Sequence, residues 1–331
     1  MLTMMTIAAS SLTLPTWTTS TMTAPKVSGH ATAVDLSTGN VLVFAGLTGS
    51  AGSPCTNDLW SFDGTAWQKL DTIGEGPGPR MYSAAATLGQ NLYVFGGWDP
   101  EAPGSGGTFK DDVWKLHLPT LTWTQLDPMP CGPVSRHVAC TVGETVVVHT
   151  FRGVLTLDGA SGILHEQPTS GEAPSAISMC AASSLGDSAM MIFGGSSKTQ
   201  QMSSDVYVLD TSSWEWRRLH TAQDEGQPVP TPRASSCAAP AGGSSCVIFG
   251  GAGLGGGGYN GGAGLVASDE TWRVTVDGNV ASWELLKPKG EVPHARVAAS
   301  LCPLPSGGFL LQGGWDPASK ETFGATSVLG I

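Results

Sequence analysis

A short motif recurs along the chain at a nearly constant interval, and it limits the folds that the sequence can adopt. The motif is a hydrophobic residue followed, after one position, by Gly-Gly or Ala-Gly, and it occurs as VFAG, VFGG, IFGG, IFGG and LQGG. Its last residues are Gly46, Gly97, Gly195, Gly251 and Gly314. Neighbouring copies lie about fifty residues apart, and the interval from Gly97 to Gly195 is about two periods. Such a period is typical of a protein built from one repeated structural unit.

Each repeat carries further marks in a fixed order. A segment of small residues that begins near Pro or Arg precedes the glycine pair, as in PRMYSAAATL and PRASSCAAP. After the pair come a loop, an alternating strand such as NDLWSFD or DDVWKLH, and a strand with tryptophan such as LTWTQL. The stretch TVVVHTFRGVLTLD, at 145–158, keeps this order with a shortened loop and with His149-Thr150 in place of the glycines. It supplies a degenerate third repeat, so we expect six units.

Each unit predicts four short strands joined by three turns, which about fifty residues accommodate. One such sheet cannot bury both faces by itself, so the units should stack and close into a ring. The innermost strand faces a crowded axis that favours small side chains, and its cysteines are predicted to be buried hydrophobic residues: Cys140, Cys180, Cys237 and Cys302. The tryptophans of the last strands are predicted to pack the blades: Trp67, Trp123, Trp216 and Trp283.

In the order of these marks, the chain resembles the kelch-repeat family over essentially its whole length. The family's fold is an all-β propeller of four-stranded antiparallel blades around a central channel. The resemblance implies one domain over 1–331, a six-bladed kelch-type β-propeller with blades at approximately 25–72, 78–128, 133–168, 173–221, 231–288 and 293–331. The last blade lacks a tryptophan strand after ATSVLGI. We expect the segment 14–23, which contains Trp17, to complete that blade and close the ring.

Charge and cysteine usage narrow the partners and the compartment. The formal net charge is −11, and no run of cations is longer than Arg217-Arg218. Nucleic acids and anionic membranes are bound through clusters of cations, so neither is an expected partner. The seven cysteines form no CxxC pair, and the N-terminus lacks the features of a secretory or transit signal. We therefore expect a monomeric propeller without cofactor or metal, in the cytoplasm or the nucleus.

The kelch resemblance also indicates where a ligand would bind. In the family, the loops after the second and the fourth strands gather at one end of the ring. Cations near the start of the first strands are then expected at the mouth of the channel, where kelch arginines often hold acidic peptide side chains: Arg80, Arg136, Arg233, Arg296 and Lys26. The alternative is that the arginines pair with acids of neighbouring blades and tie blade to blade. The sequence leaves both interpretations open.

Two tryptophans are further candidates for this end. Trp98 and Trp315 belong to two copies of GGWDP, and each begins a long loop. Exposed tryptophan beside polar groups is typical of contact hot spots, although each tryptophan could instead cap its own blade. The loop Gly251–Leu265 is rich in glycine but lacks the Lys of a phosphate-binding loop, and it is interpreted as a mobile surface loop.

The sequence contains no recognisable catalytic set. It has no GxSxG motif, no metal-spaced pair of His, and no Glu-x3-Asp-x3-His pattern of the iron-binding kelch proteins. The favoured function is a non-catalytic module that binds a protein or peptide, with an acidic segment as the candidate ligand. The alternative is a metal-assisted enzyme or specifier protein that uses the channel mouth, with Asp99, Asp316 and His137 as ligands. A third option is that the propeller is one domain of a longer protein.

Overall fold

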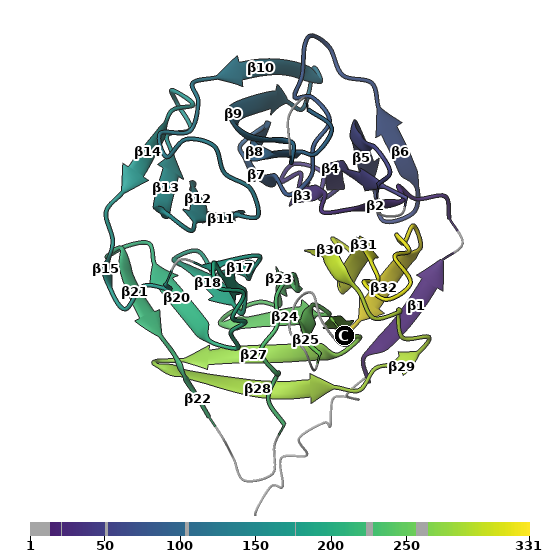
Figure 1. Ribbon diagram of the computed structural model, residues 1–331, viewed down its shortest axis with the longest axis vertical. Helices are drawn as coiled ribbons and strands as arrows, with labels where there is room; N and C mark the ends of the chain where they lie inside the picture. The colour runs from purple at the N-terminus through teal and green to yellow at the C-terminus, as the bar shows by residue number, and fades with distance from the viewer. Residues whose placement is uncertain are drawn as a thin grey trace, which may run out of the picture.

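The computed structural model describes residues 14–20, 22–49, 52–102, 106–175, 177–222, 228–255 and 264–331. Across these residues the regular elements are β-strands, and no helix is long and apolar enough to cross a membrane. Six antiparallel blades surround a central axis, and Figure 1 views them along it. The all-β six-bladed propeller predicted from the repeats is therefore confirmed.

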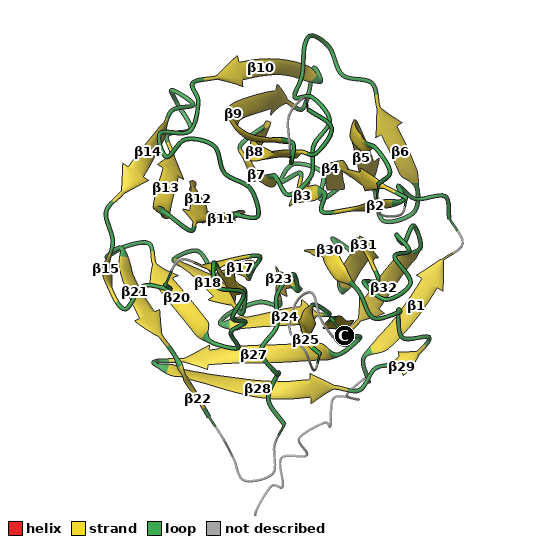
Figure 2. Ribbon diagram, in the orientation of Figure 1, coloured by secondary structure: helices red, strands yellow, loops and turns green. Residues whose placement is uncertain are grey.

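Each blade is a meander whose first strand lies nearest the axis and whose fourth lies at the rim, with loops between them (Figure 2). Blades one to three consist of β3 (Ala31–Val34), β4 (Val41–Thr48), β5 (Cys55–Phe62) and β6 (Trp67–Leu70); β7 (Ala84–Leu88), β8 (Asn91–Asp99), β9 (Thr108–His117) and β10 (Thr122–Leu126); and β11 (Val138–Val142), β12 (Thr145–Thr150), β13 (Gly153–Leu157) and β14 (Leu164–Gln167). The degenerate third repeat thus forms a complete blade.

Blades four to six have the same plan. They consist of β17 (Ala181–Leu185), β18 (Ala189–Phe193), β20 (Val206–Asp210) and β21 (Glu215–Arg218); β23 (Cys237–Pro240), β24 (Ser245–Phe249), β27 (Thr271–Asp277) and β28 (Val280–Leu286); and β30 (Val297–Pro303), β31 (Phe309–Trp315), β32 (Thr326–Gly330) and β1 (Thr16–Ser20). Three short antiparallel additions lie beside the blades: β2 (Val27–Ser28) on β4, the pair β16 (Ile177–Ser178) and β19 (Ser196–Ser197), and the pair β25 (Ala252–Leu254) and β26 (Leu265–Ala267).

The N-terminal strand closes the ring, as predicted. β1 pairs antiparallel with β32, with Trp17 opposite Leu329, and Figure 1 shows the purple strand beside the yellow one. Trp17 is only 2% exposed, and its ring meets Phe249 of blade five edge-on at 5.5 Å. One strand therefore joins the two ends of the described chain and anchors blade six to blade five.

The segments between blades cover several outer edges. β15 (Ser170–Gly171), β22 (His220–Thr221) and β29 (Lys289–Gly290) pair parallel with β21, β28 and β1, in each case beside the fourth strand of the following blade. An uncovered edge strand is a template for aggregation, so these short pairings protect the rim.

The hydrophobic core lies between the blades. The buried apolar residues of the described chain form six clusters, and each cluster combines residues of two adjacent blades. The rim tryptophans contribute as predicted: Trp123 and Trp216 are buried, Trp67 packs on Phe62 at 4.9 Å, and Trp283 packs on Phe193 at 5.1 Å.

The hub cysteines behave as buried residues. Cys180, Cys237 and Cys302 are buried and Cys140 is half-buried, and all four are free thiols. Burial raises the pKa of Cys140, Cys180 and Cys237 to about 12 and that of Cys302 to about 11. A thiol with such a pKa is a poor nucleophile at neutral pH, so the predicted packing role is supported.

The glycine pair is required by close contacts between backbones. Gly97 has a φ of 114°, and a Cβ there would lie 3.1 Å from the carbonyl oxygen of Met81. Its amide donates to the carbonyl of Val134 in the next blade at 2.9 Å, and Gly46, Gly195 and Gly251 make the equivalent bonds. The Gly-Gly of GGWDP is therefore structural, and it fastens each of these blades to the next.

Candidate partner-binding site at the channel mouth

The bonds from the glycine pairs define an equivalent position before each first strand. We call it the lead-in position: its carbonyl accepts the amide of the second glycine of the preceding blade, and Arg80, Val134, Arg233 and Arg296 occupy it. Two residues later, each blade has a residue with positive φ. These six residues are Gly29, Tyr82, Arg136, Met179, Ser235 and Ala298, with φ values between 53° and 60°.

The six positive-φ residues form a closed ring of hydrogen bonds around the axis. The amide of each donates to the carbonyl of the one in the preceding blade at 2.6–3.1 Å, from Tyr82 to Gly29, from Arg136 to Tyr82 and onward until Gly29 donates to Ala298. A positive φ is unfavourable for residues other than glycine, and the closed ring offsets this cost. We call this belt the mouth ring, because its side chains line the axial opening.

The mouth ring corrects the alignment of the cations made from the sequence. Arg136 is a ring residue, two positions after the lead-in residue Val134, and it is not equivalent to Arg80, Arg233 and Arg296. Lys26 precedes Val27, which lies two residues before Gly29 and so takes the lead-in position of blade one. The five cations expected at one position thus occupy three different ones.

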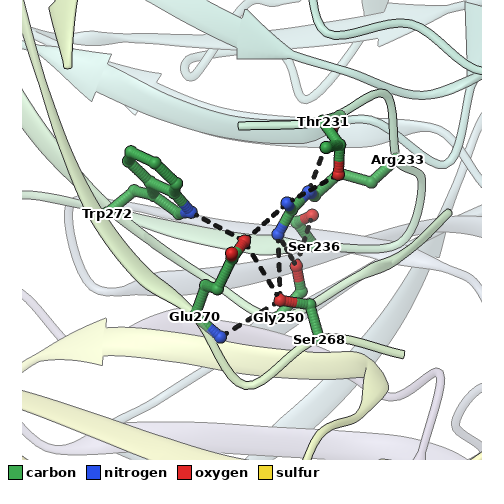
Figure 3. Close-up of polar contacts among 7 residues, drawn as sticks. All are labelled: Thr231, Arg233, Ser236, Gly250, Ser268, Glu270 and Trp272. Atoms are coloured by element: carbon green, nitrogen blue, oxygen red, sulfur yellow. Dashed lines mark hydrogen bonds and ion pairs between the residues drawn. The ribbon is translucent and has the colours of Figure 1, made fainter. Parts of the chain in front are cut away.

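Two lead-in arginines are buried inside their own blades. Arg80 is 1% exposed and makes a two-pronged ion pair with Asp112, at 2.6 and 2.8 Å. Arg233 is 4% exposed, and its Nη2 donates to Glu270 at 2.6 Å and its Nη1 to Ser268 Oγ at 3.1 Å, as Figure 3 shows. Trp114 and Trp272 donate to the same two carboxylates.

The environment of these carboxylates keeps them ionised. Burial works in the opposite direction, but the hydrogen bonds and charge of Arg80 and Arg233 hold the pKa values of Asp112 and Glu270 below the ordinary range. The acids belong to the same blade as the arginine, so each pair joins the lead-in segment to its own third strand. This geometry favours a structural role for Arg80 and Arg233.

Arg136 has a different environment. Its side chain is half-buried, with the guanidinium 4.7 Å from the ring centre of Tyr82 and 5.3 Å from that of Trp98. It donates to Ser135 Oγ at 3.2 Å and makes no ion pair within the described part of the chain. Two aromatic rings therefore orient a cation that has no carboxylate partner among the described residues.

Trp98 and Trp315 contribute to the mouth in different ways. Trp98 is half-buried, donates from Nε1 to the carbonyl of Gly106 at 2.9 Å, and stacks on Phe109 at 6.3 Å. Trp315 lines a depression of about 430 Å³ over the mouth ring. The depression is also lined by Val297 of blade six and by residues of blades two to five, which include Tyr82, Arg136, Met179, Gln200, Met202 and Leu265. Arg136 thus lies between the depression and Trp98.

More cations surround this end of the ring. Two cations lie over the ring of Phe151, in the tight turn between β12 and β13. The guanidinium carbon of Arg152 is 4.9 Å from the ring centre, and Nζ of Lys198, from blade four, is 5.1 Å from it. Lys26 is exposed, and among the described residues its ion-pair partner is Glu321, at 4.0 Å. Sequence reasoning missed Tyr82, Arg152 and Lys198. Tyr82 could have been found, because it follows Pro79 at the same spacing as the ring residue Arg136 follows Pro133. The stretch 256–263 of the glycine-rich loop lies outside the described residues, and its flanks pair as β25 and β26.

The residues named for the metal alternative do not converge. Asp99 pairs with Lys110 at 3.6 Å, and Asp316 accepts the amides of its own turn. His137 lies in the hub against Gly96, where burial lowers its pKa to about 4. Among the residues that the structure covers, no three His, Cys, Asp or Glu side chains are grouped as metal ligands.

Comparison with known proteins places the chain in a family. The KLHDC2/KLHL20/DRC7 Kelch-repeats domain matches residues 2–160 and 149–329. Host cell factor of Drosophila melanogaster is 33% identical over 126 residues, which are 34% of this chain and 8% of that protein. Adagio protein 3 of Arabidopsis thaliana is 27% identical over 267 residues, 75% of this chain and 40% of that protein. The chain thus spans less than half the length of these relatives.

A solved structure gives independent support for the fold. The structure titled "Structure of YjhT" superposes with a TM-score of 0.68 at 19% identity, over 92% of this chain and 95% of that one. At this identity the likeness concerns the fold alone. The domain match over nearly the full sequence, with the blade order and the glycine pairs, leads to one conclusion. The chain belongs to the Kelch-repeat family of β-propellers.

Proposed function

We propose that this chain is a non-catalytic module that binds a protein or peptide partner at the channel mouth, and that Arg136 holds a carboxylate of that partner. The observation that carries the proposal is the Arg136 guanidinium on the mouth ring, which makes no ion pair with a described residue and which Tyr82 and Trp98 fix beside an open depression. A guanidinium fork matches a carboxylate in shape and charge, and rigid aromatic neighbours reduce the entropy lost on binding.

The distribution of charge supports an acidic ligand. Arg136, Arg152 and Lys198 gather at the mouth of a chain whose net charge is −11. The turns at the opposite end carry aspartates that bind their own turn residues: Asp35, Asp63, Asp158 and Asp210. An acidic segment would therefore be attracted to one end of the propeller and repelled by the other.

Buried titratable groups do not offer a competing site. His137 and the hub cysteines have strongly displaced pKa values, but burial is the largest cause in each case. A catalytic acid or base also needs a partner group and room for a substrate. The small side chains around these groups leave an axial cavity of only about 190 Å³.

Direct binding tests the proposal. A partner would be identified by affinity purification from the native cell, produced in pure form, and titrated calorimetrically against the propeller. Arg136→Ala should weaken binding about thirtyfold, which corresponds to the 2 kcal/mol of a hot-spot residue. Arg217→Ala is the matched control, because Arg217 bonds to Gly278 at the opposite end and its loss should leave binding unchanged.

Two results would contradict the proposal. Wild-type affinity in Arg136→Ala would remove the mouth as the site, and an equal loss in both variants would show that the effect is not local. Stoichiometric metal in protein purified without chelator would instead favour the metal-assisted alternative.

A further inference from the structure

Blade six lacks an acidic residue at a repeated position near the start of the third strand, where four of the other blades have one. The position is identified from the pairing of the second and third strands. The second-strand residue that lies two places before the Gly-Gly or Ala-Gly pair faces an aromatic residue in four blades and serine in blade six: Val43, Val94, Ile192, Ile248 and Leu311 face Trp60, Trp114, Tyr207, Trp272 and Ser327. Two residues before these partners stand Asp58, Asp112, Asp205, Glu270 and, in blade six, Ala325. We call this the acid position. In blade six, alanine replaces the acid, and serine replaces the neighbouring aromatic residue.

The acids and the lead-in arginines can be compared blade by blade. Blades two and five have both groups, and they pair. Blades one and four have Val27 and Ile177 at the lead-in position, and their acids bind an outer-strand cation instead: Asp58 pairs with Lys69 at 2.8 Å, and Asp205 with Arg218 at 2.7 Å. Blade three has neither, with Val134 at the lead-in position and, because Val147 faces Thr156, Val154 at the acid position. Blade six alone combines a lead-in arginine with no acid, and all of these positions are described.

Arg296 is nevertheless held as its equivalents are. It is 3% exposed, and its Nε donates to the carbonyl of His294 at 2.9 Å and its Nη1 to that of Gly313 at 3.0 Å. Arg80 and Arg233 make the same two kinds of bond, to Gly78 and Gly96 and to Thr231 and Gly250. The difference is Nη2. In Arg80 and Arg233 it donates to the acid, whereas in Arg296 it has no hydrogen-bond partner among the described residues.

An aromatic ring covers the face of this guanidinium and leaves its edge available. The centre of the Phe323 ring lies 4.1 Å from the guanidinium carbon of Arg296. The ring of His294 stacks parallel to that of Phe323, with 5.9 Å between the two ring centres. Stacking on the face does not use the in-plane N–H donors. Burial lowers the pKa of Arg296 to about 10, and no carboxylate contributes to that shift. The side chain is still a cation at neutral pH.

We propose that blade six contains a second carboxylate-binding site, the blade-six socket, formed by Arg296 Nη2 beside Ala325 and Ser327. The carboxylate of a bound ligand would occupy the place that Asp112 and Glu270 fill in blades two and five. Those two side chains are 19% and 39% exposed, so the equivalent place can be reached from solvent. Lys26 lies next to the socket, because its Cβ is within 3.1 Å of a Cβ placed on Gly324.

The socket goes beyond the mouth site, since it depends on a different arginine and a different blade. The first test supplies the acid within the chain. Ala325→Asp should place a carboxylate on Arg296 and raise the melting temperature by about 2–4 °C. Ala318→Asp adds the same charge to an exposed turn of the same blade and should not raise it. Ala325→Glu follows the side chain of blade five and guards against a poor fit of Asp. If neither acid at 325 raises the melting temperature above that of Ala318→Asp, the socket is refuted.

The second test supplies the carboxylate from outside. Acetate is compared with chloride at equal ionic strength by thermal shift, and a labelled hexaglutamate peptide is titrated by fluorescence anisotropy. The wild type should respond to at least one probe, and Ala325→Asp should lose that response by at least tenfold because its own carboxylate fills the socket. A response to acetate identifies a small carboxylate as sufficient, whereas a response to the peptide alone identifies a peptide-borne one. Arg136→Ala should keep the Ala325-sensitive response, which separates this site from the mouth. No response in the wild type, or an equal response in Ala325→Asp, would overturn the proposal.

Discussion

The two histidines of blade three are predicted to make the stability of the propeller sensitive to mild acid. His137 and His149 are 7% and 5% exposed, and burial is the largest cause that lowers the pKa of each to about 4. His137 directly precedes β11, and His149 lies in β12 opposite Val138 and meets Trp216 of blade four edge-on at 5.5 Å. Protonation of His149 therefore has to place charge in the interface between blades three and four, and protonation of His137 has to place charge in the hub against Gly96 of blade two.

The sign and size of the effect follow from proton binding. Above pH 6.5 both histidines are neutral in the folded and the unfolded chain, and they add no pH dependence. Below pH 6.5 the unfolded chain takes up protons that the folded chain rejects until about pH 4, so stability falls across this window. Between pH 7 and pH 5 the loss is about 2 kcal/mol per histidine, or about 4 kcal/mol for both.

Urea denaturation followed by tryptophan fluorescence at pH 7, 6 and 5 measures this loss. His137→Gln and His149→Phe should each reduce the difference in unfolding free energy between pH 7 and pH 5 by about 2 kcal/mol, and His30, whose pKa burial also lowers to about 4, contributes a similar share in both variants. His220→Gln, at an exposed histidine, should leave the difference unchanged. A wild-type unfolding free energy that is constant from pH 7 to pH 5 would refute the reasoning, as would an unchanged slope in both buried variants.

Two further substitutions test the fold. Glu270→Gln leaves Arg233 buried without its counter-ion and should cost about 1–3 kcal/mol in unfolding free energy. The control Glu284→Gln, at the exposed pair with Arg273, should cost less than about 0.5 kcal/mol. Equal losses in the two variants would show that burial of the pair has no effect on stability. Trp17→Ala removes the side chain that anchors the closing strand and should cost about 3–5 kcal/mol in unfolding free energy, measured by chemical denaturation. Leu14→Ala is the control, since Leu14 is 57% exposed. A loss in Trp17→Ala similar to that of the control would contradict closure by β1.

The repeats allowed the architecture to be predicted because each mark has a local physical cause. Positive φ and close backbone contacts require the glycine pair, a crowded axis requires small first-strand residues, and an open edge on blade six requires a strand such as Thr16–Ser20. These requirements act within one blade or between neighbours, so they appear in the sequence as a regular order. Even the third repeat, without glycines, could be recognised by its strands.

The candidate site was only partly predictable, because its residues meet across variable loops. Arg80 and Asp112 are 32 residues apart, and Arg233 and Glu270 are 37 apart, so the sequence could not show that these arginines are satisfied within their blades. Arg136 was assigned to the site, but at the wrong repeat position, since SRH was aligned with PR. Pro133 shows the correct alignment: Val134 follows it as Arg80 follows Pro79. Trp98, Trp315 and Lys26 remain predictions as partner-binding residues.

Hydrogen–deuterium exchange of the propeller with and without its purified partner is the most direct test of binding at the mouth. We expect the partner to slow exchange in the segments 134–138 and 196–202, which contain Arg136 and one wall of the depression, and to leave the turns 63–66, 158–162 and 277–279 at the opposite end unchanged. Slower exchange at those turns without any change around Arg136 would contradict the account.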